Sequence, residues 1–229
     1  MKSSYASHRI KEISSFVEIN NYLEIGVFDG RTFLNVDFKN KVGVDPYFRF
    51  DYKSNISDKS KLIQVTSDEY FSNLIERGEQ FDLIFIDGLH EFKQTLRDIC
   101  ASVAHSHERT LWIIDDVYPV DVFSSWPEQM KAINFRKEQG LEGGQWHGDV
   151  YKVVFFIHDY MPSFSYITIS DGANRQLLMW KEPRENFSPE MKSLKDIEDM
   201  HYFLMREKDD IFNLTPWSEC LSLLKQIYK

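Results

Sequence analysis

A short apolar run that ends in a glycine turn constrains this chain more than any other feature. Residues 23–30 read LEIGVFDG, and residues 41–45 read KVGVD. The first segment predicts a buried strand followed by a tight turn, and the second predicts another strand that ends in a carboxylate. In an open parallel sheet, this arrangement builds a nucleoside pocket beyond the carboxyl ends of the strands. The pattern therefore indicates a nucleoside-binding α/β fold.

Apolar runs and amphipathic segments alternate along most of the remaining chain. Expected strands cover residues 22–27, 42–44, 62–65, 81–86, 110–114, 164–170 and 176–182, and expected helices cover residues 9–19, 31–36, 69–76, 92–105 and 149–157. Ser67 is the expected N-cap of the helix at 69–76. Strands that alternate with helices at this spacing predict βαβ units, which build a mainly parallel sheet with right-handed crossovers. The fold class is therefore α/β.

The length of 229 residues fits one complete α/β domain and a small extension. We expect the domain to span residues 1–188, with a loop rich in Pro and Gly at residues 117–148 over the carboxyl edge of its sheet. Long loops of this kind are usually functional. Residues 189–229 are expected to form a helical extension, interrupted at Pro216, whose apolar positions could pack on the domain or on a second subunit. A homodimer is therefore one expectation.

The charge balance narrows the set of partners. The formal net charge of −9 leaves no basic field to neutralise a phosphate backbone, so we expect no nucleic-acid partner. Cys100 and Cys220 have neither metal-binding nor redox spacing and are expected to be reduced thiols. No segment has the pattern of a signal peptide or a membrane span. We therefore expect a cytoplasmic protein without a membrane partner.

The glycine turn also limits which nucleoside can bind. A dinucleotide fingerprint needs a middle glycine where the backbone approaches a pyrophosphate, and the turn from Gly26 to Gly30 lacks it. Asp29 lies where the phosphate would approach and would repel it. No phosphate-binding P-loop sequence occurs. A nucleoside without phosphates that carries a positive charge remains, and S-adenosylmethionine fits that description.

At this point several segments carry a resemblance to a known family. They are EIGVFDG at 24–30, GVDP at 43–46, TSDEYF at 66–71, FDLIFIDGLH at 81–90 and GDVYK at 148–152. Together they resemble the class I S-adenosylmethionine-dependent methyltransferases, in particular the small bacterial group that acts on sugars or secondary metabolites. The resemblance covers roughly residues 9–182. It implies a Rossmann-like, doubly wound, mainly parallel seven-stranded sheet with an antiparallel last strand and helices on both faces.

The resemblance also implies roles for individual residues. Glu24 and the backbone at Gly26, in the turn that Gly30 closes, would face the methionine part of the cofactor. Asp45 would bind the ribose hydroxyl groups, and Ser67 would lie near the adenine. Asp87 would lie at a strand end between the methionine and the methyl acceptor.

Methyl transfer to a hydroxyl group requires alignment of donor and acceptor and removal of a proton. Three residues are candidates for the proton-accepting role. Asp87 ends a strand, His90 follows it by three residues, and His147 lies in the long loop. The sequence does not choose among them.

A second group of carboxylates indicates a metal site. Asp87 ends one strand, and Asp115 and Asp116 end the next one along the chain, so their oxygen atoms can converge. Such a site suits Mg²⁺ or another divalent ion. The pattern resembles the metal-dependent O-methyltransferases, in which the ion would lower the pKa of the acceptor hydroxyl group. The alternative is that Asp116 caps a turn and only Asp115 faces the pocket, and both readings stay open.

These features predict a methyltransferase that uses S-adenosylmethionine to methylate a hydroxyl group on a sugar, a glycan unit or a small secondary metabolite, with or without a divalent ion. One alternative is an oxidoreductase on a similar sheet that depends on NAD or a nucleotide sugar. Another is a methyltransferase-like partner protein without catalytic activity.

Overall fold

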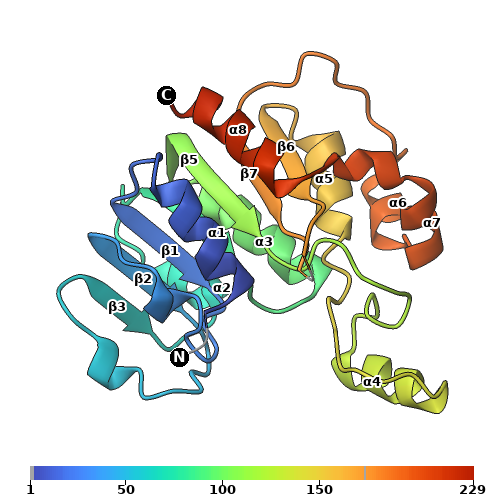
Figure 1. Ribbon diagram of the computed structural model, residues 1–229, viewed down its shortest axis with the longest axis horizontal. Coiled ribbons are helices and arrows are strands. Elements are labelled where there is room, and N and C mark those ends of the chain that lie inside the picture. Colours follow the sequence, from blue (N-terminus) through green and yellow to red (C-terminus); the bar gives the residue numbers. More distant parts are fainter. Residues whose placement is uncertain (1–2, 173) are drawn as a thin grey trace.

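An eight-stranded sheet forms the centre of the computed structural model, which describes residues 3–172 and 174–229 (Figure 1). The strand order is β3-β2-β1-β4-β5-β7-β6-β8. The strands are β1 (Asn21–Ile25), β2 (Asn40–Val44), β3 (Ser60–Ile63), β4 (Phe81–Ile86), β5 (Ser106–Ile114), β6 (Phe164–Ile169), β7 (Leu177–Lys181) and β8 (Leu214–Thr215). Only β7 runs against its neighbours, since it pairs antiparallel with both β5 and β6. The expected Rossmann-like sheet with its antiparallel strand is confirmed, with eight strands instead of seven because β8 adds a two-residue edge to β6.

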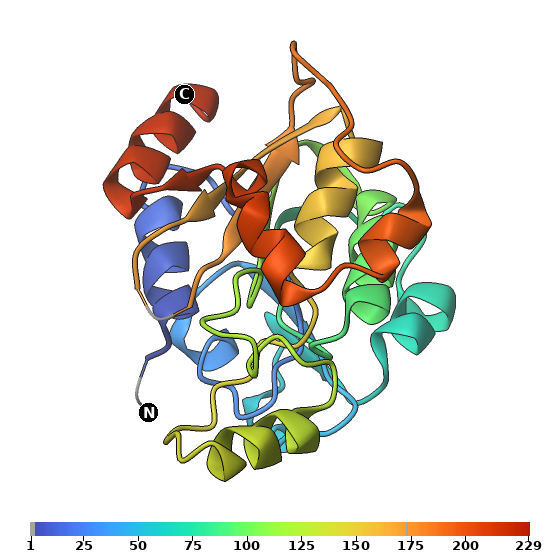
Figure 2. The ribbon, with the colours of Figure 1, turned by 90° about the vertical axis from the view of Figure 1, so that its right-hand side faces the viewer.

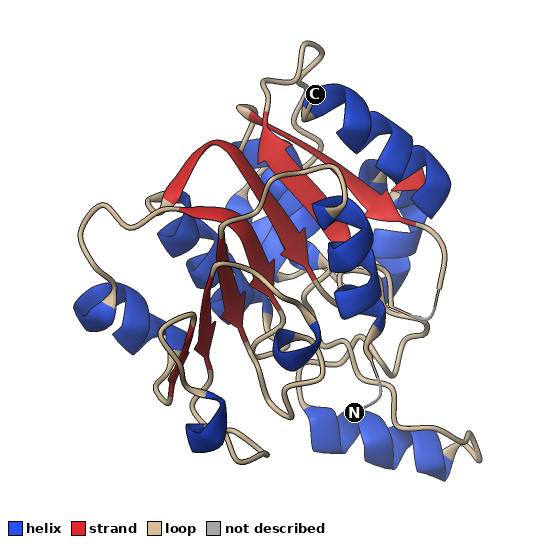
Figure 3. Ribbon diagram, turned by 60° about the vertical axis from the view of Figure 1, so that its left-hand side comes forward, coloured by secondary structure: helices blue, strands red, loops and turns tan. Residues whose placement is uncertain are grey.

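Helices cover both faces of the sheet (Figure 3). The helices are α1 (Tyr5–Ser14), α2 (Ser67–Glu69), α3 (Phe92–Val103), α4 (Gln129–Glu138), α5 (Lys152–Tyr160), α6 (Leu194–Glu198), α7 (Tyr202–Glu207) and α8 (Trp217–Ile227), with short turns η1 (Phe33–Asn35), η2 (Lys53–Asn55), η3 (Tyr70–Leu74) and η4 (Asp209–Phe212). Helices α1 and α8 pack in the core on one face, and α3, α5, α6 and α7 pack in the core on the other.

Strand β4 shows why the sequence forms a sheet that is buried on both faces. Its side chains alternate between the two cores: Leu83 and Phe85 join the α1 face, whereas Ile84 and Ile86 join the α3 face. Successive side chains of a strand point to opposite faces, so a strand with helices on both sides must be apolar throughout. This is the signal that identified the strand in the sequence.

The expected helix at residues 31–36 is wrong, because only the single turn η1 forms there. The buried side chain of Lys41, on the next strand, donates to the carbonyl oxygens of Phe33 and Val36 at 2.9 and 2.8 Å. A lysine from β2 thus donates to carbonyl oxygens that would accept from backbone N–H groups four residues later if the helix continued.

The expected helix at residues 69–76 is also shorter than predicted. It divides into α2 and the turn η3, which closes with π-type bonding. Thr66, not Ser67, caps α2, and its hydroxyl group accepts from the N–H of Glu69. Ser67 becomes the first helical residue, so its side chain is available for other contacts.

The long loop and the C-terminal segment complete the chain. Helix α4 lies within the loop at residues 117–148 and stands away from the sheet (Figure 1). Helices α6 and α7 lie near α5, and α8 lies near α1 on the other face of the sheet (Figure 2). Ile197 and Met205 join one core, and Cys220 and Leu224 join the other, so the segment packs on its own domain. Packing on a second subunit and the boundary at residue 188 stay predictions.

Among the described residues, no helix has both the length and the apolar character that a membrane crossing requires.

Candidate functional site

Carboxylates mark the carboxyl edge of the parallel strands. Asp45 follows β2, Asp87 follows β4, and the pair Asp115–Asp116 follows β5. Parallel strands end at the same edge of a sheet, which is where ligands of open α/β folds bind. Asp116 has a φ of 58°, a left-handed conformation that turns the chain sharply beyond the strand.

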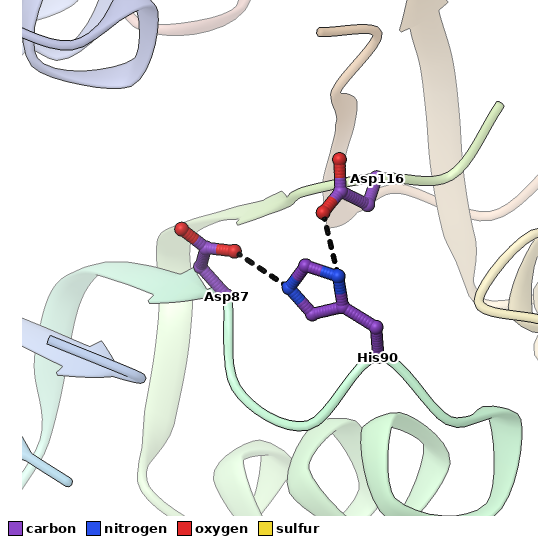
Figure 4. Close-up of side chains that lie close together, drawn as sticks. All are labelled: Asp87, His90 and Asp116. Atoms are coloured by element: carbon purple, nitrogen blue, oxygen red, sulfur yellow. Dashed lines mark ion pairs between the residues drawn. The ribbon is translucent and has the colours of Figure 1, made fainter. Parts of the chain in front are cut away.

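His90 lies between two of these carboxylates (Figure 4). Its Nε2 is 3.5 Å from Oδ1 of Asp87, and its Nδ1 is 3.0 Å from Oδ2 of Asp116. One donor atom from each of the three residues lies within 4.8 Å of the others. The short loop between β4 and α3 brings His90 back over the end of its own strand, so the cluster joins two neighbouring strand ends.

The electrostatics make His90 a cation at neutral pH. Burial lowers the pKa of His90, but the hydrogen bond to Asp87 and the negative charge of Asp116 outweigh it and raise the pKa to about 9. Burial likewise raises the pKa of Asp116 to about 7, against the opposing effect of the His90 charge. The cluster therefore holds one imidazolium between two carboxyl groups.

The long loop brings a second histidine to the cluster. Trp146 stacks on the His90 ring with 4.8 Å between centroids, and its carbonyl oxygen lies 3.2 Å from His90 Nδ1. The Nε2 of His147 lies 3.7 Å from Oδ1 of Asp116, and its Nδ1 is buried without a hydrogen-bond partner among the described residues. Burial and the charge of His90 lower the pKa of His147 to about 4, so it is neutral. The structure thus gathers all three candidate proton acceptors in one place.

Gly148 fixes the loop against the histidine. Its φ is 62°, and a Cβ at this position would lie 1.7 Å from the carbonyl oxygen of His90. No other residue permits this close backbone contact. In the sequence Gly148 stands out only as the first residue of the GDVYK segment, which gives no sign of this packing role.

Asp115 lies outside this three-residue cluster. Its Oδ1 accepts from Nδ2 of Asn174 at 3.2 Å and from the backbone N–H of Asp116 at 2.9 Å. Burial raises its pKa well above the ordinary value. The three predicted metal ligands were Asp87, Asp115 and Asp116. In the structure Asp87 and Asp116 lie together, and the third possible ligand beside them is His90. The sequence predicted His90 only as a proton acceptor. Its position three residues after Asp87 is the sequence feature that indicates it can lie beside that carboxylate.

The glycine turn packs directly on the end of β4. Gly26 has a φ of 88°, and a Cβ there would lie 1.9 Å from the carbonyl oxygen of Asp87. Asp45 braces the turn from the other side: Oδ2 accepts from the N–H of Phe28 at 2.8 Å, and Oδ1 accepts from the N–H of Tyr47 at 2.7 Å. Asp45 therefore joins the ends of β1 and β2, a structural role that the sequence did not indicate.

Glu24 lies beneath the turn. It is 1% exposed, and its Oε2 accepts from the Tyr22 hydroxyl group at 2.5 Å. Burial raises its pKa well above the ordinary value. Its carboxyl group is thus enclosed by protein on the same face of β1 as Tyr22.

Ser67 belongs to a polar network at the start of α2. Nε2 of Gln94 donates to the Ser67 hydroxyl oxygen at 3.1 Å and to Oδ1 of Asp98 at 3.0 Å. Asp98 is 2% exposed, and burial raises its pKa from 3.8 to about 6. The network ties α2 to α3 beside the strand ends.

We expect the Asp98→Asn substitution to change how stability depends on pH. Between pH 4 and pH 6 the folded protein binds this proton more tightly than the unfolded chain, so the free energy of unfolding falls as the pH rises through this window. The amide does not titrate, so the variant should gain roughly 2–3 kcal/mol relative to the wild type between these pH values. Urea unfolding at pH 4 and pH 8 measures the difference. A constant difference at both pH values would contradict the expectation.

Comparisons with known proteins address the same region. Residues 23–117 match the family model described as a methyltransferase domain. The fold is similar to cofactor-bound Rv0187 from MTB, with a TM-score of 0.55, 13% identity, and 80% of this chain and 83% of that chain covered. No curated protein matches the sequence.

Two further structures share the fold. One is the O-methyltransferase TomG from Streptomyces achromogenes, involved in tomaymycin synthesis and solved with S-adenosylmethionine (TM-score 0.54, 11% identity, 79% of this chain and 82% of that chain covered). The other is an O-methyltransferase from Bacillus cereus in complex with S-adenosylhomocysteine (TM-score 0.52, 16% identity, 79% and 83% covered). At these identities the likeness shows a common fold, and the family model matches residues 23–117.

Proposed function

We propose that this chain is a class I, S-adenosylmethionine-dependent methyltransferase that methylates a hydroxyl oxygen of a small acceptor, such as a sugar unit or a secondary metabolite. The match of residues 23–117 to a methyltransferase-domain model and the fold shared with two O-methyltransferases support this proposal. The observation that carries this proposal is the cluster of Asp87, His90 and Asp116 at the carboxyl edge of the sheet. It supplies a group that can take the proton from the acceptor oxygen at the place where ligands of this fold bind.

The acids around the glycine turn suit a cationic cofactor. Burial raises the pKa of Asp87, and the negative charges of Asp29 and Asp45 raise it further. Three carboxylates this close favour a sulfonium nucleoside and repel the pyrophosphate of a dinucleotide, which weighs against the oxidoreductase alternative. Asp45 would hold the ribose hydroxyl groups, Ser67 would lie near the adenine, and Asp87 would lie beside the methionine part. When bound, the cofactor supplies the electrophilic methyl group.

The proton acceptor that we propose is His90. Its imidazolium cannot accept a proton while its pKa is about 9. A cation bound beside Asp87 repels the imidazolium and competes for its carboxylate, so it lowers the pKa of His90. The neutral ring could then take the acceptor's proton on Nε2, and the bound cofactor would supply the methyl group to the acceptor oxygen. His90 would end as an imidazolium as the sulfonium becomes a neutral thioether, so the net charge of the site would be conserved.

A divalent ion at the same three residues is the second candidate. The donor set of two carboxylates and one imidazole suits Mn²⁺ or another transition ion better than Mg²⁺, which prefers oxygen ligands alone. Such an ion would lower the pKa of the acceptor hydroxyl group and fix its orientation. His90 must lose its proton before it can bind a metal, so this candidate predicts binding that strengthens as the pH rises.

We expect methyl transfer to persist in excess EDTA, because each carboxylate of the cluster already has the His90 cation as its partner. The measurement is release of S-adenosylhomocysteine from S-adenosylmethionine with a panel of catechols, flavonoids and hexose derivatives, in EDTA and with added Mg²⁺ or Mn²⁺. Activity only with an added ion would favour the metal candidate. A protein that binds S-adenosylhomocysteine but turns over none of these hydroxyl acceptors would contradict the proposed acceptor class.

The Asp45→Asn substitution should weaken S-adenosylhomocysteine binding about 10–100-fold, because a charged acceptor of hydrogen bonds contributes roughly 1.5–3 kcal/mol. The new amide NH₂, a donor, would also face one of the two backbone N–H groups from which Asp45 now accepts a hydrogen bond. Isothermal titration calorimetry measures the affinity. Asp58→Asn, at an exposed acid, makes the same charge change and should leave the affinity unchanged. Equal affinities for both variants would remove Asp45 from the cofactor site.

A further inference from the structure

Two guanidinium groups lie on the ring of Tyr118, close to the strand ends. Tyr118 follows Asp116 by two residues and is 5% exposed. The guanidinium carbon of Arg175, from the connection between β6 and β7, lies 4.2 Å from the ring centroid, and that of Arg206, from α7, lies 5.3 Å from it. Three segments that are far apart in the sequence thus place two positive charges on one buried aromatic ring.

The two arginines differ in their partners. Arg206 donates to the Tyr118 hydroxyl oxygen, and its Nη1 lies 3.6 Å from Oδ1 of Asp209. Tyr118 itself donates to the same Asp209 oxygen at 2.5 Å. Arg175 is half-buried, and its side chain forms neither a hydrogen bond nor an ion pair with any residue that the structure describes. Because Arg175 is partly exposed and has no carboxylate partner among the described residues, its N–H groups are free to bind an anionic ligand.

Arg175 lies at the carboxyl edge of the sheet. Its neighbour Asn174 donates to Asp115, and Leu177, two residues later, pairs with Ile114 at the last position of β5. Arg9 holds the connection in place, because its Nη1 donates to the Asn174 carbonyl oxygen at 2.8 Å and its Nη2 donates to the Asp171 carbonyl oxygen at 2.7 Å. The backbone at Asp171 and Asn174 is therefore tied to α1, and Arg175 follows it at the edge where the acceptor would bind.

We infer that Arg175 binds an anionic oxygen group, carboxylate or phosphate, on the methyl acceptor, so that the acceptor is an acidic hydroxylated small molecule. This inference rests on the proposed function and specifies its substrate class. A guanidinium fork matches the geometry of both anions, and its flat face can stay stacked on Tyr118 while its N–H groups point outward. In a chain with a net charge of −9 and carboxylates at the ends of β4 and β5, a guanidinium group without an ion-pair partner among the described residues favours an anionic acceptor over a neutral one.

The test uses three probes that differ only in the charged group: benzoate, phenyl phosphate and neutral benzyl alcohol. Each is titrated into the complex of the full chain with S-adenosylhomocysteine, with binding followed by NMR. We expect benzoate or phenyl phosphate to bind at least about tenfold more tightly than benzyl alcohol, as a charge-assisted contact predicts. Which of the two anions binds more tightly identifies carboxylate or phosphate as the group recognised.

Variants assign the preference to Arg175. Arg175→Gln should abolish the preference for the anionic probes. Arg175→Lys should retain part of this preference, because lysine keeps the positive charge but lacks the paired N–H groups of a guanidinium. Arg109→Gln is the matched control, since Arg109 also stacks on a tyrosine, Tyr228, but lies near the opposite end of β5. Similar or undetectable binding of all three probes to the wild type, or a preference that survives in Arg175→Gln, would overturn the inference. If the wild type does not bind S-adenosylhomocysteine at all, that result would instead overturn the proposed function.

Discussion

Replacing His90 with Gln is expected to slow methyl transfer about 10²–10⁴-fold, the usual contribution of a positioned general base. Glutamine can keep a hydrogen bond to Asp87 or Asp116 but cannot accept a proton. The affinity for S-adenosylhomocysteine should stay within about threefold, because Asp87, and not His90, is the residue proposed to lie beside the cofactor. The measurements are kcat with the most active acceptor of the panel, and calorimetric titration of the cofactor product.

The pH dependence separates a base from a structural residue. The wild-type rate should rise with pH through the pKa that His90 has in the cofactor complex, which should lie below the value of about 9 found without it. His90→Gln should lose this rise. His107→Gln is the control: His107 pairs with Asp82 at 2.9 Å, but at the opposite end of β4, so the substitution breaks a similar pair away from the site. A His90→Gln rate within threefold of the wild type would assign the proton to another residue, His147 first.

Much of the fold could be predicted because the signals are local. Every residue of β4 except Asp82 joins a core on one face or the other, and this requires an apolar run, broken once, that is visible in the sequence. The acids at the strand ends are visible for the same reason: they come directly after such runs. Their meeting at one edge then follows from the parallel topology alone.

The choice between adjacent acids could not be predicted. Asp115 and Asp116 are chemically equivalent in the sequence, and the left-handed backbone at Asp116 decides which of them faces His90. That conformation depends on the loop that follows. His147 is a second example, because its backbone N–H donates to the Ser124 carbonyl oxygen within a loop whose path is set by tertiary contacts. Local patterns carry no information on either point.

The absence of a helix at residues 31–36 is also caused by a tertiary contact. The sequence of this segment is compatible with a helix, but the side chain of Lys41 reaches under the turn and bonds the carbonyl oxygens of Phe33 and Val36. A competing partner from another strand decides the outcome, and propensity is a weak guide where such a partner exists.

The Gly26→Ala substitution should destabilise the fold by at least about 4 kcal/mol, in the range of the most disruptive single substitutions. Two costs add. The left-handed backbone with a φ of 88° is unfavourable for alanine by about 1–2 kcal/mol. The new Cβ would also lie 1.9 Å from the carbonyl oxygen of Asp87, so β1 and β4 must separate at the site itself. Urea unfolding measures the loss, and calorimetry should show weakened cofactor binding in any folded fraction.

Gly78→Ala separates the two costs. Gly78 has nearly the same conformation, with a φ of 87°, but a Cβ there would meet no atom within 4 Å. It should therefore lose only the backbone contribution of about 1–2 kcal/mol and leave cofactor binding unchanged. If both variants lost the same stability, the close contact between the glycine turn and Asp87 would have no energetic weight. A much larger loss for Gly26→Ala would mean that this glycine is needed to bring the turn onto the end of β4, where the cofactor and the Asp87–His90 pair must meet.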